Sequence, residues 1–195
     1  MSRQRNSLAS KHVDLTQTLI LNAAIEMLEA GLITELSVRA VAKRAEVSER
    51  TVFRYFASRG EFLDAIAAET SHRLGAPPNP TTVEELIAYP KVRFARFEAT
   101  AALTRAALHS ELYHRVRARD ALDRGVAIRA LIDRAAPHRP ARERRLAAAN
   151  IHYHVVASTW HYYRFNFGFS LDDATACARM AIVQALEGLG IALAI

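Results

Sequence analysis

Residues 37–56 combine side chains that could bind a nucleic acid with signals that would fold them into two short helices. Ser37 and Ser48 can each accept a hydrogen bond from a free backbone N–H group at a helix start. Apolar residues at spacings of three and four then give each helix a buried face; they are Val38, Val41, Ala42, Ala45, Val52 and Phe56. The pattern predicts a helix-turn-helix hairpin.

The outer face of the second helix carries charged, hydroxyl and aromatic groups, which suit the reading of DNA bases. Arginine can pair with guanine through two hydrogen bonds, and a threonine methyl can contact the methyl of thymine. The candidate base contacts are Glu49, Arg50, Thr51 and Tyr55. Helix N-termini and cationic side chains suit phosphates. The candidate phosphate contacts are Ser37, Arg39, Ser48, Phe53, Arg54 and Arg59. The alternative is a surface hairpin with a solvated charged face.

Further helices must position this hairpin. One near residues 14–30 ends at Gly31, and another begins at Arg59. Four short segments in and around the hairpin together form a recognisable sequence pattern. They are Leu36-Ser37-Val38-Arg39-x-Val41-Ala42, Ala45-x-Val47-Ser48, Thr51-Val52-Phe53-Arg54-Tyr55-Phe56 and Ser58-Arg59. Over about residues 14–66 the chain thereby resembles the TetR family of transcriptional regulators. The resemblance implies binding to a double-stranded DNA operator and a homodimer whose last two helices form a four-helix bundle.

Three positions depart from the pattern of that family. Glu46 stands where the turn usually has glycine, so the turn either needs no positive φ or tolerates one at modest cost. Phe53 replaces a tyrosine and removes a hydroxyl that could bind a phosphate. Arg59 replaces a lysine and keeps the charge.

Composition limits the fold class and the compartment. The 195 residues are 51 % hydrophobic, with seven glycines and no alternating β-branched segment that requires a strand, so an all-α protein is expected. The net charge of +6 suits a polyanionic partner. Cys177 is the only cysteine, and neither a signal peptide nor a membrane-spanning stretch is evident, so a cytoplasmic location is expected.

The chain divides at its proline-rich segment. Residues 1–74 are expected to form the three-helix DNA-binding domain with a connecting helix, and they include a disordered basic arm over residues 1–12. Residues 75–81 form a linker, and residues 82–195 a larger helical ligand-binding and dimerisation domain. Its longest predicted helix is 141–167, and its last begins at a Ser170-x-x-Asp173 capping box.

Aromatic residues with a few polar tips suggest a ligand pocket in the second domain. Such a lining suits a mostly apolar small molecule. The candidates are Phe94, Phe97, Leu108, Leu112, Tyr113, Asn150, Tyr153, His154 and Trp160. The alternative is an aromatic stripe that belongs to the ordinary core or to a dimer contact.

The last helix carries a broad apolar stripe of small residues that one intramolecular partner would not fully cover. The candidate dimer contacts are Ala174, Ala178, Ala181, Ile182, Ala185 and Leu189. The alternative is that this stripe is wholly internal.

No motif in the chain indicates catalysis, a cofactor or a metal site. The histidines lack the spacings of three or four that place two ligands on one helical face. A nucleophile elbow and a glycine-rich phosphate loop are also missing from the sequence. The sequence therefore predicts a non-enzymatic, ligand-responsive dimeric repressor of a pseudo-palindromic operator. The alternative is an architectural or partner-controlled DNA-binding regulator without a small-molecule effector. The operator, the target genes and the effector stay open, as does activation in place of repression.

Overall fold

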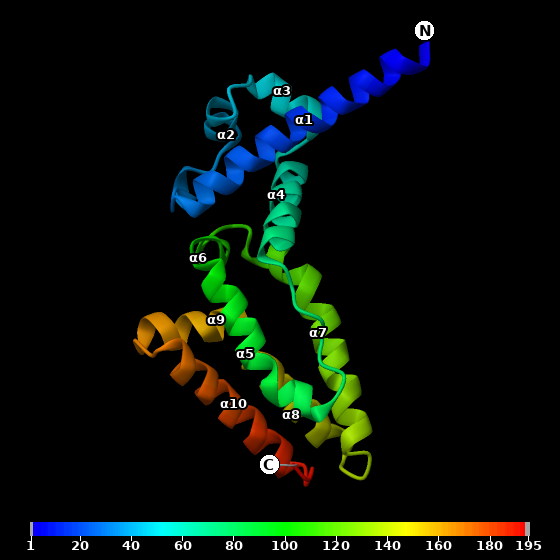
Figure 1. Ribbon diagram of the computed structural model, residues 1–195, viewed down its shortest axis with the longest axis vertical. Helices are drawn as coiled ribbons and strands as arrows, with labels where there is room; N and C mark the ends of the chain where they lie inside the picture. The colour runs from blue at the N-terminus through cyan, green and yellow to red at the C-terminus, as the bar shows by residue number, and fades with distance from the viewer. Residues whose placement is uncertain (1, 194–195) are drawn as a thin grey trace. The chain divides into compact units, whose positions relative to one another are not determined.

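The computed structural model describes the backbone of residues 2–193 and the side chains of residues 15–118 and 121–193. All regular structure in this part of the chain is helical, which confirms the all-α prediction (Figure 1). Two compact units are present: unit 1 is Met1–Arg73 with Arg105–Val116, and unit 2 is Leu74–Thr104 with Arg117–Ile195. The sequence placed residues 105–116 wholly in the second domain. Across the described residues, no helix is both long and apolar enough to span a bilayer.

Unit 1 begins with a long helix, α1 (Ser2–Glu29), which packs on α2 (Val38–Arg44). The basic arm predicted to be disordered is therefore part of α1. Proline and glycine, which stop helices, do not occur between Ser2 and Asp14. Gly31 ends α1 with φ 77°, and the Leu32 N–H donates to the Met27 carbonyl at 2.9 Å. This geometry is a Schellman motif, in which a left-handed residue closes the helix.

The hairpin helices α2 and α3 (Glu49–Tyr55) are followed by α4 (Arg59–Leu74). Ser58 and Glu61 start α4: Ser58 Oγ accepts from the Glu61 N–H at 3.2 Å, and Glu61 Oε2 accepts from the Ala57 N–H at 2.9 Å. Phe56 and Phe62 are buried, with ring centroids 5.3 Å apart. They fix the chain reversal from α3 into α4.

Unit 2 consists mainly of α5 (Val83–Ala99), α7 (Tyr113–Ala135), α8 (Ala141–Tyr153) and α10 (Leu171–Gly188). Two shorter helices are α6 (Ala101–His109), shared with unit 1, and α9 (Ala157–His161). Helix α10 packs on α5 and α8. One apolar cluster joins α5, α7, α8 and α10 through buried Leu86, Ile128, Ile132, Ile151, Ile182 and Leu186.

The predicted continuous helix 141–167 is wrong. Helix α8 ends at Tyr153, α9 starts at Ala157, and a π-helical turn follows over Tyr162–Asn166. Side chains bind the carbonyls that this break frees: Arg93 Nε donates to Val155 O at 3.4 Å, and Thr159 Oγ1 donates to Tyr153 O at 2.5 Å. These two side-chain partners, one of them distant in sequence, stabilise the broken helix.

The proline-rich segment is packed onto unit 2. Tyr89 Oη donates to Pro77 O at 3.4 Å, and Arg134 Nη2 donates to Thr81 O at 3.2 Å. Arg96 Nε donates to the Leu74 carbonyl, and Gly75 beside it has φ 58°. A Cβ atom on Gly75 would lie 2.7 Å from Arg96 Nη2. This segment therefore belongs to the folded unit and is not a loose tether.

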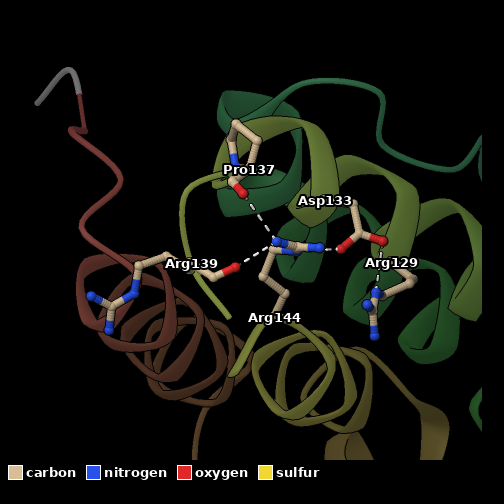
Figure 2. A network of polar contacts seen from close by, with 5 residues as sticks. All are labelled: Arg129, Asp133, Pro137, Arg139 and Arg144. Atoms are coloured by element: carbon tan, nitrogen blue, oxygen red, sulfur yellow. Dashed lines mark hydrogen bonds and ion pairs between the residues drawn. The ribbon is translucent and has the colours of Figure 1, made fainter. Parts of the chain in front are cut away.

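The turn from α7 to α8 is held by a polar network around Asp133 (Figure 2). Arg129 Nε and Arg144 Nε lie 2.8 and 2.7 Å from the two carboxylate oxygens of Asp133. Arg144 also donates to the carbonyls of Pro137 and Arg139, at 3.2 and 2.5 Å. The hydrogen bonds from Arg129 and Arg144 hold the pKa of Asp133 below its usual value.

Candidate DNA-binding site

Both helices of the hairpin start at the serines that the sequence indicates. Ser37 Oγ accepts from the Ala40 N–H at 3.2 Å, and Ser48 Oγ accepts from the Thr51 N–H at 3.0 Å. On the inner face, Val41, Ala42 and Val52 are buried. The local fold therefore presents α3 with a capped N-terminus and an outward polar face.

Glu46 adopts the left-handed conformation in the turn, with φ 56°. Its N–H donates to Lys43 O at 3.3 Å, and the Val47 N–H donates to Ala42 O at 2.9 Å. The turn is thus the same Schellman motif that ends α1, with glutamate in the place of glycine. Of the two alternatives, positive φ tolerated at a cost is the one observed.

Most of the predicted DNA contacts are exposed on unit 1. They are Ser37, Arg39, Ser48, Glu49, Arg50, Phe53, Arg54 and Arg59. Phe53 is 46 % exposed although it is a large apolar side chain. It lies on α3 together with the exposed side chains of Arg50 and Arg54.

Thr51 and Tyr55 are half-buried and have partners within the protein. Thr51 Oγ1 lies 2.8 Å from Ser48 Oγ, so its hydroxyl is engaged at the helix start. A hydrogen bond with Thr16 of α1 holds the pKa of Tyr55 below its usual value. Tyr55 therefore anchors α3 to α1. Thr16 and Tyr55 are far apart in the sequence, so no local sequence signal predicts their contact.

Arg59 and Arg44 form ion pairs in the structure. Arg59 pairs with Glu111, and Arg44 Nε lies 3.1 Å from Glu26 Oε2. Arg115 pairs with Asp64 of α4. These pairs tie α4 to residues 105–116 within unit 1. An ion pair at Arg59 competes with its predicted phosphate contact.

The predicted ligand residues fall into separate places. Phe94, Phe97 and Trp160 are buried in one cluster of unit 2, where the Phe97 and Trp160 ring centroids are 5.8 Å apart. Glu98 binds this cluster, accepting from Trp160 Nε1 at 3.0 Å and from Arg164 Nη2 at 2.7 Å. The remaining residues do not join them: Asn150 and Tyr153 are exposed and His154 is half-buried, whereas Leu108, Leu112 and Tyr113 belong to unit 1.

An open pocket of about 450 Å³ also lies in unit 2. It contains none of the predicted ligand residues. Its lining is Gly75, Ala76, Pro77, Val92, Ala95, Arg96 and Ala99.

Most of the predicted dimer stripe faces the core of its own protomer. Ala174, Ala178, Ile182 and Leu189 are buried, whereas Ala181 and Ala185 are half-buried. The apolar residues that α8 and α10 expose are different ones. Leu146, Tyr153 and Met180 are 50 %, 61 % and 57 % exposed.

The capped, outward-facing α3 and its packing against α1 and α2 define a helix-turn-helix DNA-binding domain. The sequence profile described as "Bacterial regulatory proteins, tetR family" matches residues 20–66, which span α2 and α3. This segment of the chain is therefore similar to the DNA-binding domain of TetR-family transcriptional regulators.

The chain is similar in fold to a solved structure. That structure is native NalD of Pseudomonas aeruginosa, the secondary repressor of the MexAB-OprM multidrug efflux pump. The TM-score is 0.56 at 15 % identity, over 89 % of this chain and 96 % of that one. No curated protein sequence matches the chain.

Proposed function

We propose that the protein is a ligand-responsive homodimeric repressor that binds a pseudo-palindromic operator through α3. The observation that carries this proposal is the exposed, capped α3 with Arg50 and Arg54 on its outer face. One short helix reads too few base edges alone, so two copies related by a twofold axis would read two half-sites. The repressor role of NalD supports repression, and binding to the chromosome would place the protein in the cytoplasm.

The outer faces of α8 and α10 are the proposed dimer contact. These helices pack on each other within the protomer and expose Leu146, Tyr153 and Met180. Exposed apolar side chains on adjacent helices favour a second apolar surface. This proposal replaces the contacts through Ala174, Ala178, Ile182 and Leu189. Met180→Glu should shift the protein to monomer in sedimentation experiments, whereas Arg142→Glu, also exposed on α8, should leave the dimer intact.

Selection of genomic fragments with the purified protein, followed by fluorescence anisotropy, tests operator binding. We expect an enriched palindrome bound at least about 1000-fold more tightly than random DNA. Arg50→Ala should weaken operator binding by about 10-fold or more, since one base contact contributes about 1–3 kcal/mol. Lys91→Ala removes an exposed cation from α5 of unit 2 and should change operator affinity little. Equal losses in the two variants, or binding indifferent to sequence, would count against α3 as the reading helix.

Effector response is tested by screening metabolites for release of the labelled operator. A ligand that binds the native protein should also raise its melting temperature. Ligands that stabilise the protein and leave operator affinity unchanged would contradict the proposed coupling. In that case the protein would be a DNA-binding regulator without a small-molecule effector.

A further inference from the structure

Two ion pairs join α4 to residues 105–116 within unit 1. Arg59, the first residue of α4, lies with its Nη2 atom 2.5 Å from Glu111 Oε1. Asp64, also on α4, pairs with Arg115. The two pairs have opposite polarity, because α4 supplies the cation of one and the anion of the other. Of these four residues, Arg59 alone is among the predicted DNA contacts.

The start of α4 is a favourable place for an anion. A helix N-terminus carries a partial positive charge, and Arg59 adds a full positive charge there. The rings of Phe56 and Phe62, with centroids 5.3 Å apart, keep this start close to the end of α3. Arg59 is therefore near the helix that is proposed to read the operator.

The turn that carries Glu111 is fixed by its own contacts. Leu112 is fully buried, and its N–H donates to Ser110 Oγ at 3.2 Å. The Tyr113 N–H donates to the Ser110 carbonyl at 3.1 Å, which closes the turn before α7. The carboxylate of Glu111 therefore reaches Arg59 from a folded segment that is distant from the hairpin in sequence.

The Arg59–Glu111 pair is exposed enough for Arg59 to exchange its partner. The side chains of Arg59 and Glu111 are 58 % and 41 % exposed. An exposed ion pair contributes little free energy in water, whereas a contact between arginine and a DNA phosphate is charge-assisted and releases counterions. A phosphate at Arg59 leaves the carboxylate of Glu111 unpaired or close to a second anion, and both outcomes cost affinity.

We propose that Glu111 competes with a DNA phosphate for Arg59 and thereby holds operator affinity below the value that Arg59 would otherwise give. A residue outside the helix-turn-helix thus sets how tightly the protein holds its operator. This inference rests on the proposed operator binding and adds a residue that regulates it.

Glu111→Gln tests the competition by fluorescence anisotropy on the full-length protein with the operator selected from genomic fragments. The substitution keeps the shape of the side chain and removes its charge. Operator binding should become about 2- to 5-fold tighter at low salt, which is the range that an exposed ion pair supplies. The plot of log affinity against log salt concentration should become steeper by up to about 1 per protomer, because the freed Arg59 adds a phosphate contact. Glu111→Asp keeps the charge on a shorter side chain and should tighten binding less.

Two further variants separate this competition from a general change of charge. Asp64→Asn also removes one negative charge beside α4, but its partner Arg115 is not a predicted DNA contact. Operator affinity should therefore change less in Asp64→Asn than in Glu111→Gln. In a protein that already carries Arg59→Gln, Glu111→Gln should bring no gain, because the cation for which the two anions compete is gone.

Three results would overturn the inference. They are unchanged or weaker operator binding by Glu111→Gln, an equal gain in Asp64→Asn, and a gain that persists without Arg59. If Glu111→Gln does not fold, Glu111→Asp with and without Arg59→Gln decides the matter by the same comparison. Specific operator binding by the unaltered protein leaves the proposed function standing in each of these cases. Binding by the unaltered protein that is indifferent to DNA sequence would reject the proposed function, and the inference with it.

Discussion

Glycine in place of Glu46 should make the DNA-binding unit more stable. A left-handed backbone costs an L-residue about 1–2 kcal/mol. Glycine removes that cost but gains about 0.4–1 kcal/mol of unfolded-state freedom. The net expectation is a stabilisation of about 0.5–1 kcal/mol, or roughly 1–4 °C in melting temperature for a chain of this length.

The chain contains its own control for this prediction. Gly31 ends α1 in the same motif with φ 77°, and an added Cβ atom there would meet nothing within 4 Å. Gly31→Ala should therefore destabilise the protein by a similar amount, about 0.5–1 kcal/mol, through backbone strain alone. Glu46→Ala keeps the Cβ atom and should leave stability close to that of the unaltered protein.

Two optical signals can locate the change. Trp160 is the only tryptophan and lies in unit 2, so its fluorescence follows that unit, whereas far-ultraviolet circular dichroism follows all helices. Where the two units unfold separately, Glu46→Gly should move the dichroism transition and leave the fluorescence transition in place. A Glu46→Gly protein no more stable than the Glu46→Ala protein would refute the assignment of strain to this turn.

Three other changes have clear expected outcomes. Hydrogen bonds from Arg164 and then Trp160 keep the pKa of Glu98 low. The stability that they contribute is therefore present above the ordinary pKa of 4.5 and is lost as pH falls through the lower pKa of the folded state. Glu98→Gln should reduce this loss of stability in acid, measured by unfolding followed through Trp160 fluorescence. The pKa of His152 is lowered from 6.5 to about 4, so the unfolded state binds the proton first and stability should fall from pH 6.5 towards 4; His152→Gln should reduce that slope in urea unfolding. Gly75→Ala should lower stability by about 1–2 kcal/mol in the same assay, because φ is positive and the Cβ atom displaces Arg96, whereas Gly188→Ala at an open helical position should not.

Local signals were sufficient to predict the hairpin. Ser37 and Ser48 act within three residues of their partners, and the spacing of Val41 and Val52 needs only helical periodicity. The same reasoning predicted the start of the last helix: Ser170 Oγ accepts from the Asp173 N–H at 3.0 Å. Interactions between residues three or four apart can be predicted from the local sequence alone.

Contacts between distant residues decided the features that the sequence did not reveal. The break after Tyr153 depends on Arg93, which is far from Val155 along the chain. Burial of Ala174 and Ala178 depends on which side of α10 meets the aromatic cluster of Phe94, Phe97 and Trp160. The apolar stripe of one helix shows that the helix has a buried side, but the same stripe fits burial within the protomer and burial against a second protomer.

The hydrogen bond from Arg96 to the Leu74 carbonyl has a mechanical consequence. Leu74 is the last residue of α4, and Arg96 belongs to α5. The residue that accepts the hydrogen bond is thus the end of α4 itself. The start of the proline-rich segment is therefore held to α5 and cannot swing freely from the end of α4.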